Sequence, residues 1–404
     1  MKLRYFQLYK IIIYIISILW FIRLGHPTIY ISLFLTLIAF FMYITQKEKH
    51  KLDCVIVSYV ILEITLFIIQ IIRLRVYNLS DISFSDLDFL YGEVFLLLLS
   101  FPIYEVICVE KESFFKEICY FALIVLVIKA LVWYLFNFQN IDLGYFFIGG
   151  AERWVRFSLG RLLYRMTGTS LDGFIFAYFI TNLFVKNEFK VKLISAMGII
   201  FLFLFALFIS QSRVQIIYYS FSIFIGLAYY TWHTKNRELT FIFLFILLVS
   251  LSCLMKDKIW NFINSFSLNS NIGDSTQIRL LEYSYFGNLW KNVSWMWGFG
   301  MINEPIIING IAYWLSDLGI ADILFQFGII GFAIGIIPFF IGLKELIKVF
   351  KSNVTIINFF FVCMTAYYLI SISNINPYRN VNYLTIPFYV AFIMYIINLN
   401  KRNI

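Results

Sequence analysis

Continuous apolar stretches of about 20 residues recur along the chain and limit what it can fold into. A stretch of this length crosses the hydrocarbon core of a bilayer as one α-helix. Charged residues make up only 14% of the chain, against about 25% in soluble globular proteins. The alternating pattern of a membrane barrel is absent from the sequence. We therefore expect an all-α polytopic membrane protein in which residues 1–404 form a single integral membrane domain.

About 12 transmembrane helices account for the apolar stretches. The N-terminal segment is basic and then apolar, as in a signal peptide, but no small-residue cleavage site follows. We therefore interpret it as an uncleaved first span. The sixth span is short and could extend into the preceding loop. The predicted spans are residues 9–24, 27–45, 52–72, 88–109, 118–138, 171–185, 193–211, 213–232, 239–255, 319–343, 355–373 and 380–399.

Lysine-bearing loops set the expected orientation. Short loops with lysine are typical of the cytoplasmic side of a membrane protein. This assignment, with an even number of spans, predicts that both termini are cytoplasmic. It also leaves two long loops outside: an outer basic loop at 139–170 and a large loop at 256–318. The lysine-bearing inner segments are 46–51, 110–117, 186–192, 233–238, 344–351 and the tail 401–404.

The basic residues expected on the outer side are mostly arginines. Arginine stays charged and binds phosphate or carboxylate with two parallel hydrogen bonds. We infer that the outer face handles an anionic ligand such as a pyrophosphate. The alternative is that the arginines are interfacial anchors that reach lipid headgroups. We favour this alternative for Arg23, Arg73 and Arg75. The outer arginines are Arg23, Arg73, Arg75, Arg153, Arg156, Arg161, Arg165, Arg213, Arg279 and Arg379.

The outer basic loop at 139–170 has arginines at spacings of three, five and four, beginning at Arg153. Such spacing places arginines on one face of a helix, and interleaved aromatic residues favour a helix that lies at the membrane interface. The alternative role is binding of anionic lipid. Further along, the tight turn at 210–213 is expected to hold Arg213 at the membrane surface.

The large loop contains a predicted amphipathic helix. Asp274 and Gln277 have the spacing of a capping box at its start. Gly298 and Gly300 are expected to break the helix and allow close backbone approach. Arg279 and Glu282 are expected on a face other than the apolar one. The predicted apolar face consists of Ile278, Leu281, Tyr285 and Leu289.

Three carboxylates follow near the outer end of the tenth predicted span: Glu304, Asp317 and Asp322. A carboxylate here could act as general base on an acceptor hydroxyl. The alternative roles are a partner for an arginine and a charge at a helix N-terminus. Glycines at 328–335 suggest a small-residue stripe for close helix packing.

Two ionisable residues, Glu63 and Lys129, fall near span centres. Unpaired charges are costly there, so we expect a buried ion pair between spans three and five. The alternative is a proton or ion relay. No His and Cys cluster has metal-ligand spacing, so no metal site is expected. The net charge of +9 lies at span ends and does not indicate nucleic acid.

Four motifs in order resemble those of the O-antigen polysaccharide polymerases of the Wzy type, within the wider group that includes O-antigen ligases. The similar segments are RMTGTSLDGFIFAYF at 165–179, SQSR at 210–213, IRLLEYSYFGNLWKNVSWMWGFG at 278–300 and SDLGIADILFQFGIIG at 316–331.

This resemblance implies a membrane-embedded glycosyltransferase with a GT-C-like fold, which moves a glycan from undecaprenyl diphosphate to a hydroxyl on the next lipid-linked repeat unit. It implies the bacterial inner membrane, no cofactor and no metal, and a chain-length regulator protein as a partner. Arg165, Arg213 and Arg279 match the family's pyrophosphate-binding arginines, and Arg279 and Asp317 are the catalytic candidates. The further candidates are Arg161, Glu304, Asp322 and Arg379.

Two alternatives remain open on the sequence. Ligase-type relatives carry a histidine where this chain has Asp317, and the large loop contains no histidine, which favours a polymerase. A transporter or flippase of lipid-linked sugars would explain Glu63 and Lys129. Against it, the sequence shows no internal repeat of the kind common in transporter folds.

Overall fold

A computed structural model describes residues 2–22, 26–77, 92–158, 161–233, 274–302, 306–308, 310–374, 376–378 and 384–402. The predicted ninth span at 239–255 lies outside these residues, as does most of the first part of the large loop. Arg23, Glu304 and Arg379 also lie outside them.

Helices occupy the other eleven predicted spans. Seven helical segments in the described part of the chain are long and apolar enough to cross a membrane. The predicted boundaries are several residues too short at many ends, because helices continue into the polar interface. The helices are α1 (Lys2–Ile22), α2 (His26–Thr45), α3 (Cys54–Tyr77), η1 (Gly92–Leu99) with α5 (Ser100–Glu110), α6 (Glu112–Gln139), α7 (Asp172–Val185), α8 (Phe189–Leu204) with η3 (Phe205–Ile209), α9 (Arg213–Trp232), α13 (Ile320–Gly335) with α14 (Ile337–Val349), α15 (Ile356–Ser371) and α16 (Thr385–Arg402).

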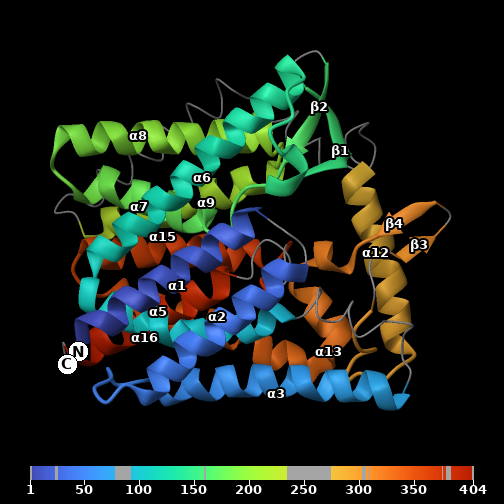
Figure 1. The fold of residues 1–404 in the computed structure, drawn as a ribbon, viewed down its shortest axis with the longest axis horizontal. Coiled ribbons are helices and arrows are strands. Elements are labelled where there is room, and N and C mark those ends of the chain that lie inside the picture. Colours follow the sequence, from blue (N-terminus) through green and yellow to red (C-terminus); the bar gives the residue numbers. More distant parts are fainter. Residues whose placement is uncertain are drawn as a thin grey trace.

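The helices form a bundle with α3 along one edge and α8 along the other (Figure 1). The helices α15 and α16 form its centre, and their side chains are buried almost without interruption from Phe359 to Tyr368 and from Leu384 to Ile397. Helices that are apolar all round pack inside a membrane bundle. By contrast, α2 exposes Phe34 and Phe41, as expected of a helix that faces lipid.

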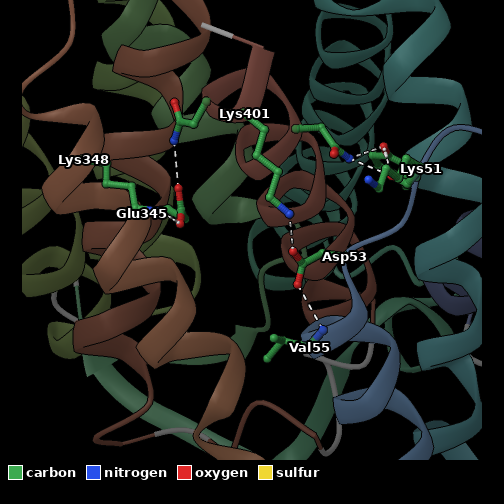
Figure 2. Close-up of polar contacts among 9 residues, drawn as sticks. Lys51, Asp53, Val55, Glu345, Lys348 and Lys401 are labelled. Carbon is green, nitrogen blue, oxygen red and sulfur yellow. Dashed lines mark hydrogen bonds and ion pairs between the residues drawn. The ribbon is translucent and has the colours of Figure 1, made fainter. Parts of the chain in front are cut away.

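Both termini lie at one end of the bundle (Figure 1), which we call the termini end. Figure 2 shows the polar contacts there: the Lys401 ammonium lies 2.9 Å from the Asp53 carboxylate, and Lys348 lies 2.6 Å from Glu345. The Asn400 amide donates to Glu345 at 2.8 Å. These contacts join the C-terminal helix to two of the lysine-bearing loops.

A further ion pair joins two other predicted inner loops. Lys186 lies 3.8 Å from Glu112, which connects residues 186–192 with residues 110–117. The described inner loops at 110–117 and 186–192 therefore lie on the same side of the bundle, as the predicted orientation requires.

The opposite end, which we call the loop end, carries α12 (Asp274–Lys291). This helix runs crosswise to the spans in Figure 1. Its start at Asp274 agrees with the predicted helix start. The crosswise direction fits a helix that covers the end of a bundle rather than one that crosses a membrane.

The prediction of a helix in the 139–170 loop is wrong. A 3₁₀ turn, η2 (Tyr145–Ile148), leads into an antiparallel hairpin of β1 (Gly150–Ser158) and β2 (Arg161–Met166), in which Ser158 pairs with Arg161. Trp154, Val155 and Phe157 belong to the residue types that favour strands, and this preference outweighed the arginine spacing.

A second hairpin, β3 (Ile306–Ile308) with β4 (Ile311–Tyr313), lies in the large loop and was also not predicted. It is followed by a 3₁₀ turn, η4 (Leu315–Leu318). The chain is therefore mostly helical, but the loops at this end contain two small antiparallel sheets.

The helix α13 is interrupted at Gly328, and residues 295–300 fill the interruption. The Phe299 and Gly300 amides donate to the Phe325 and Gln326 carbonyls at 3.0 and 2.9 Å. In return, the Ile329 amide donates to the Trp295 carbonyl at 3.1 Å. Non-helical backbone at membrane depth requires such internal partners. We call this arrangement the interlock; it joins two of the motifs that carried the family resemblance.

Glycine makes the interlock possible. Gly298 and Gly300 have positive φ values of 69° and 88°, and Gly328 has a φ of 67°. A Cβ on Gly328 would overlap the backbone of Met296. The prediction that Gly298 and Gly300 permit close backbone approach is confirmed, but they do not break the helix, because α12 already ends at Lys291. Gly328 breaks α13, whereas Gly331 lies against Leu66 of α3.

Candidate functional site

Arg165 and Arg213 lie next to each other at the loop end through the tight turn at 210–213. Arg165, near the end of β2, is half-buried and its Nε donates to the Ser210 carbonyl at 2.8 Å. The side chain of Ser212 accepts a hydrogen bond from the Gln215 amide and caps α9, so Arg213 is the first helical residue. The turn thus fixes both arginines to the start of one membrane helix.

A buried network beneath these arginines holds the segment between β2 and α7. The Lys129 ammonium is 2% exposed and donates to the Thr167 and Gly168 carbonyls at 3.0 and 2.8 Å. Asp172, at the start of α7, accepts from the Gln215 amide group at 3.0 Å. Gln215 lies two residues after Arg213, so the network limits the movement of the arginine-bearing turn.

Arg279 of α12 completes the arginine cluster. Its positive charge lies close enough to Arg213 for the two to repel each other. Arg279 is half-buried, and among the described contacts no hydrogen bond or ion pair holds its guanidinium. Two like charges held together in a partly buried place attract an anion.

Two tyrosines border Arg279. Tyr218 of α9 is 1% exposed and lies within electrostatic reach of Arg279, and its hydroxyl donates to the Ser371 carbonyl at 3.4 Å. Tyr283 lies one turn after Arg279 on α12 and donates to the Leu318 carbonyl at 3.3 Å. Burial raises the pKa of the Tyr283 hydroxyl, against the opposing effect of the Arg279 charge. The hydroxyl therefore stays a neutral donor near pH 7.

Asp317 lies in η4, next to Leu318, and is exposed. The Tyr283 hydrogen bond to Leu318 therefore joins the η4 turn to the helix that carries Arg279. An exposed carboxylate on a turn joined to the arginine-bearing helix is accessible to an incoming hydroxyl group, which is the first geometric requirement for a general base.

Asp322 has a different setting. It is fully buried and accepts from the Asn376 amide at 2.6 Å and from the Gln326 amide. Buried carboxylates with two amide donors hold structure together. Asp322 therefore joins α13 to the segment before α16, in keeping with the alternative structural role.

The predicted faces of α12 need correction. Glu282 was expected away from the packed face, but it is 1% exposed and accepts from the Trp314 amide at 2.8 Å. Phe286, one turn later, is fully buried. Leu281 is 42% exposed, although it was assigned to the apolar face. The packed face therefore runs through Glu282 and Phe286, because the Trp314 amide, just after β4, offers a donor for the carboxylate.

The other candidate arginines fall away from the centre of the cluster or outside the described chain. The backbone of Arg161 begins β2, opposite Ser158. Arg73, expected to be an interfacial anchor, donates to the Trp297 carbonyl at 2.9 Å and so holds the interlock.

The predicted ion pair between Glu63 and Lys129 is wrong. Lys129 donates to backbone carbonyls and lies within electrostatic reach of Asp172. Glu63 lies instead beside Tyr59 and Tyr378. Hydropathy gives the depth of a residue in the membrane but not the direction in which its helix faces, so the two spans could not be paired from sequence.

Within the described residues, no group of three or more His, Cys, Asp or Glu side chains could hold a metal ion. Comparison with protein families, with curated proteins and with solved structures finds no match. The fold and the site therefore define a class in physical terms: a multi-spanning α-helical membrane protein with a cluster of three arginines at the end opposite its termini.

Proposed function

We propose that this chain is a membrane glycosyltransferase of the O-antigen polymerase type. It transfers a growing glycan from undecaprenyl diphosphate to the next lipid-linked repeat unit, on the outer face of the bacterial inner membrane. The observation that carries the proposal is Arg279, which lies beside Arg213 and whose guanidinium has no hydrogen bond or ion pair among the described residues. A diphosphate between Arg279, Arg213 and Arg165 would supply the missing negative charge.

The chemistry needs few groups. The acceptor hydroxyl oxygen attacks the anomeric carbon, the bond from that carbon to the diphosphate oxygen breaks, and the hydroxyl proton passes to a base. Arginines stabilise the charge that develops on the diphosphate. Asp317 is the base in this proposal, because it is exposed on the turn that Tyr283 joins to α12, whereas Asp322 is buried and accepts from two amides. A GT-C-like arrangement of about 12 spans and a chain-length regulator partner belong to the same proposal.

The direct test uses purified protein in lipid nanodiscs with undecaprenyl-diphosphate-linked repeat units as the sole sugar source. We expect a ladder of lipid-linked polymers and release of undecaprenyl diphosphate, without added metal. The variant Arg279→Ala should form both products about 100- to 1,000-fold more slowly. A ladder of normal length and amount from Arg279→Ala would contradict the assignment of the diphosphate site.

A transporter of the same lipid-linked sugars is the second candidate. The observation that favours it is Glu63, a buried carboxyl near the middle of a membrane helix, since such residues are typical of ion pathways. Flipping of a fluorescent lipid-linked sugar in liposomes, without polymer formation, would support this alternative. The ligase alternative has no such observation in its favour.

A further inference from the structure

The helix α6 carries a stripe of exposed apolar side chains to which the glycosyltransferase proposal gives no role. Its members recur three or four residues apart, as on one face of a helix, and each is 41–58% exposed. An exposed apolar face in a chain that spans a membrane is where the chain meets lipid. The stripe consists of Ile124, Val127, Ile128, Leu131 and Tyr134.

The end of α6 reaches the membrane surface. The helix has 28 residues and is therefore about 42 Å long at about 1.5 Å per residue, whereas the hydrocarbon core of a bilayer is about 30 Å thick. Asn140, with a left-handed φ of 58°, ends the helix, and the β1–β2 hairpin that follows lies at the loop end (Figure 1). The residues after Asn140 therefore begin at the boundary between membrane and water.

Four exposed apolar side chains continue past the end of α6 within residues 141–147, which we call the apolar turn. Phe146 packs edge to face on Phe136 of α6, with ring centroids 5.6 Å apart. The surface of the turn therefore adjoins the surface of the helix. The four side chains are 39–61% exposed and belong to Ile141, Leu143, Phe146 and Phe147.

Hydrogen bonds and ring stacking give the apolar turn a fixed shape. The Asp142 carboxylate accepts from the Gly144 and Tyr145 amides at 2.9 and 2.8 Å. Tyr145 is fully buried and stacks on Phe136, with ring centroids 4.1 Å apart. Tyr145 thus fills the inward side of the turn, which leaves the four apolar side chains on the outward side.

The composition of the turn favours lipid as the partner of this surface. Asp142 is the one charged residue in 141–147, and its carboxylate accepts two amides of the turn itself. The outward side therefore offers apolar atoms, and it continues the lipid-facing stripe of α6. Phenylalanine and leucine are the side chains with which interfacial segments enter the boundary between headgroups and acyl chains.

We propose that the apolar turn is an interfacial membrane anchor, whose four exposed apolar side chains enter the boundary between lipid headgroups and acyl chains at the loop end. The partner of this surface is the phospholipid bilayer itself. The anchor does not depend on the glycosyltransferase proposal.

The anchor is joined to the strand that carries Arg165. The Tyr145 hydroxyl donates to the Arg165 carbonyl at 2.5 Å. The preceding residue, Tyr164, is held by α6: its amide donates to the Asn137 side chain at 2.8 Å, and its carbonyl accepts from the Trp133 indole at 2.7 Å. The anchor thereby sets the depth of Arg165 relative to the membrane surface.

Photocrosslinking in nanodiscs of phosphatidylethanolamine and phosphatidylglycerol tests the proposal without any sugar substrate. The photoreactive amino acid p-benzoylphenylalanine replaces Phe147 in the full chain, and mass spectrometry of the labelled peptide detects a lipid adduct. Ile128 in the stripe on α6 is the lipid-facing control position. Gln277, exposed in the first turn of α12, is the polar control position. We expect lipid adducts at Phe147 and Ile128 and none at Gln277.

Three results would overturn the proposal. A lipid adduct at Ile128 with none at Phe147 would place the turn in water. Equal adduct yields at Phe147 and Gln277 would show that lipid contact is not a property of the turn. A crosslink from Phe147 to a protein would make the partner a protein rather than the bilayer. If the Phe147 replacement fails to fold, the same amino acid at Leu143 provides the test, with the same expected and contradicting results.

Discussion

Arg279 is the residue on which the functional proposal depends. Its guanidinium is close to Arg213 and lacks a hydrogen bond or ion pair in the described contacts, although α12 offers Glu282 one turn away. That carboxylate is engaged with the β4 side of the loop instead, through the Trp314 amide. The arrangement keeps Arg279 available for an external anion.

Replacing Arg279 with alanine should reduce polymer synthesis by about 100- to 1,000-fold, the usual effect of removing one donor to a developing oxyanion. The fold should persist, because Arg279 makes no hydrogen bond or ion pair within the described protein. Polymer yield per unit of membrane protein is the measurement. Lys291→Ala removes an exposed charge from the same helix and should leave the yield unchanged; equal losses in both variants would show that only net charge matters.

Replacement by asparagine should have different effects at Asp317 and at Asp322. Asp317→Asn should lower the rate by about 100-fold or more, as for loss of a general base, and should lower stability less than Asp322→Asn does, because Asp317 is exposed. Asp322→Asn should instead destabilise the protein by about 1–3 kcal/mol, because its amide partners would lose a buried acceptor. The measurements are the polymerisation rate and the melting temperature of each purified variant. The reverse pattern would exchange the roles of the two residues.

At the scale of elements, the sequence predicted helices well and loops poorly. A long apolar run determines a membrane helix by itself, and so Ile320–Gly335 and its neighbours were found. The β1–β2 hairpin was missed because arginine spacing describes one face of a segment without deciding its conformation. The interlock depends on contacts between residues about 30 apart, and the hydrogen bond between Tyr59 and Tyr378 joins residues 319 apart. Local patterns do not contain such contacts.

The interlock makes a prediction about glycine. Gly328 adopts φ 67° and ψ −167°, a conformation that is essentially restricted to glycine and costs other residues about 1–3 kcal/mol. Gly328→Ala should therefore lower the melting temperature, and the overlap with Met296 should add to the loss. The matched control is Gly287→Ala on α12, where a Cβ meets nothing within 4 Å and the helix should gain about 0.5–1 kcal/mol. An unchanged melting temperature for Gly328→Ala would contradict the interlock.

The contact between Asp53 and Lys401 predicts a pH effect at the termini end. Burial acts to raise the pKa of Asp53, but the hydrogen bond and charge of Lys401 outweigh it and lower the pKa below its usual value. A lowered folded pKa contributes stability above the unfolded value of about 4, and this is lost as pH falls through the folded pKa. The wild type should exceed Asp53→Asn in stability by less than about 1 kcal/mol at neutral pH. Melting curves of both proteins should converge in acid; a difference that persists there would contradict the pairing.

At the scale of the whole molecule, the two ends of the bundle differ in chemistry. The termini end holds lysines in ion pairs with Asp53, Glu112 and Glu345. The loop end holds the arginine cluster, the crosswise helix α12 and the exposed Asp317. This asymmetry fits a protein that is anchored by one end and carries out its reaction at the other, and the proposed polymerase would need that division.

The most direct test of this account is a lipopolysaccharide gel from a bacterial strain that lacks the gene, with and without the gene restored. We predict that the deletion leaves core bearing a single repeat unit and no ladder, and that the wild-type gene restores the ladder while Arg279→Ala does not. Bare core alone in the deletion strain would contradict the account, because the missing step would then be ligation or export rather than polymerisation.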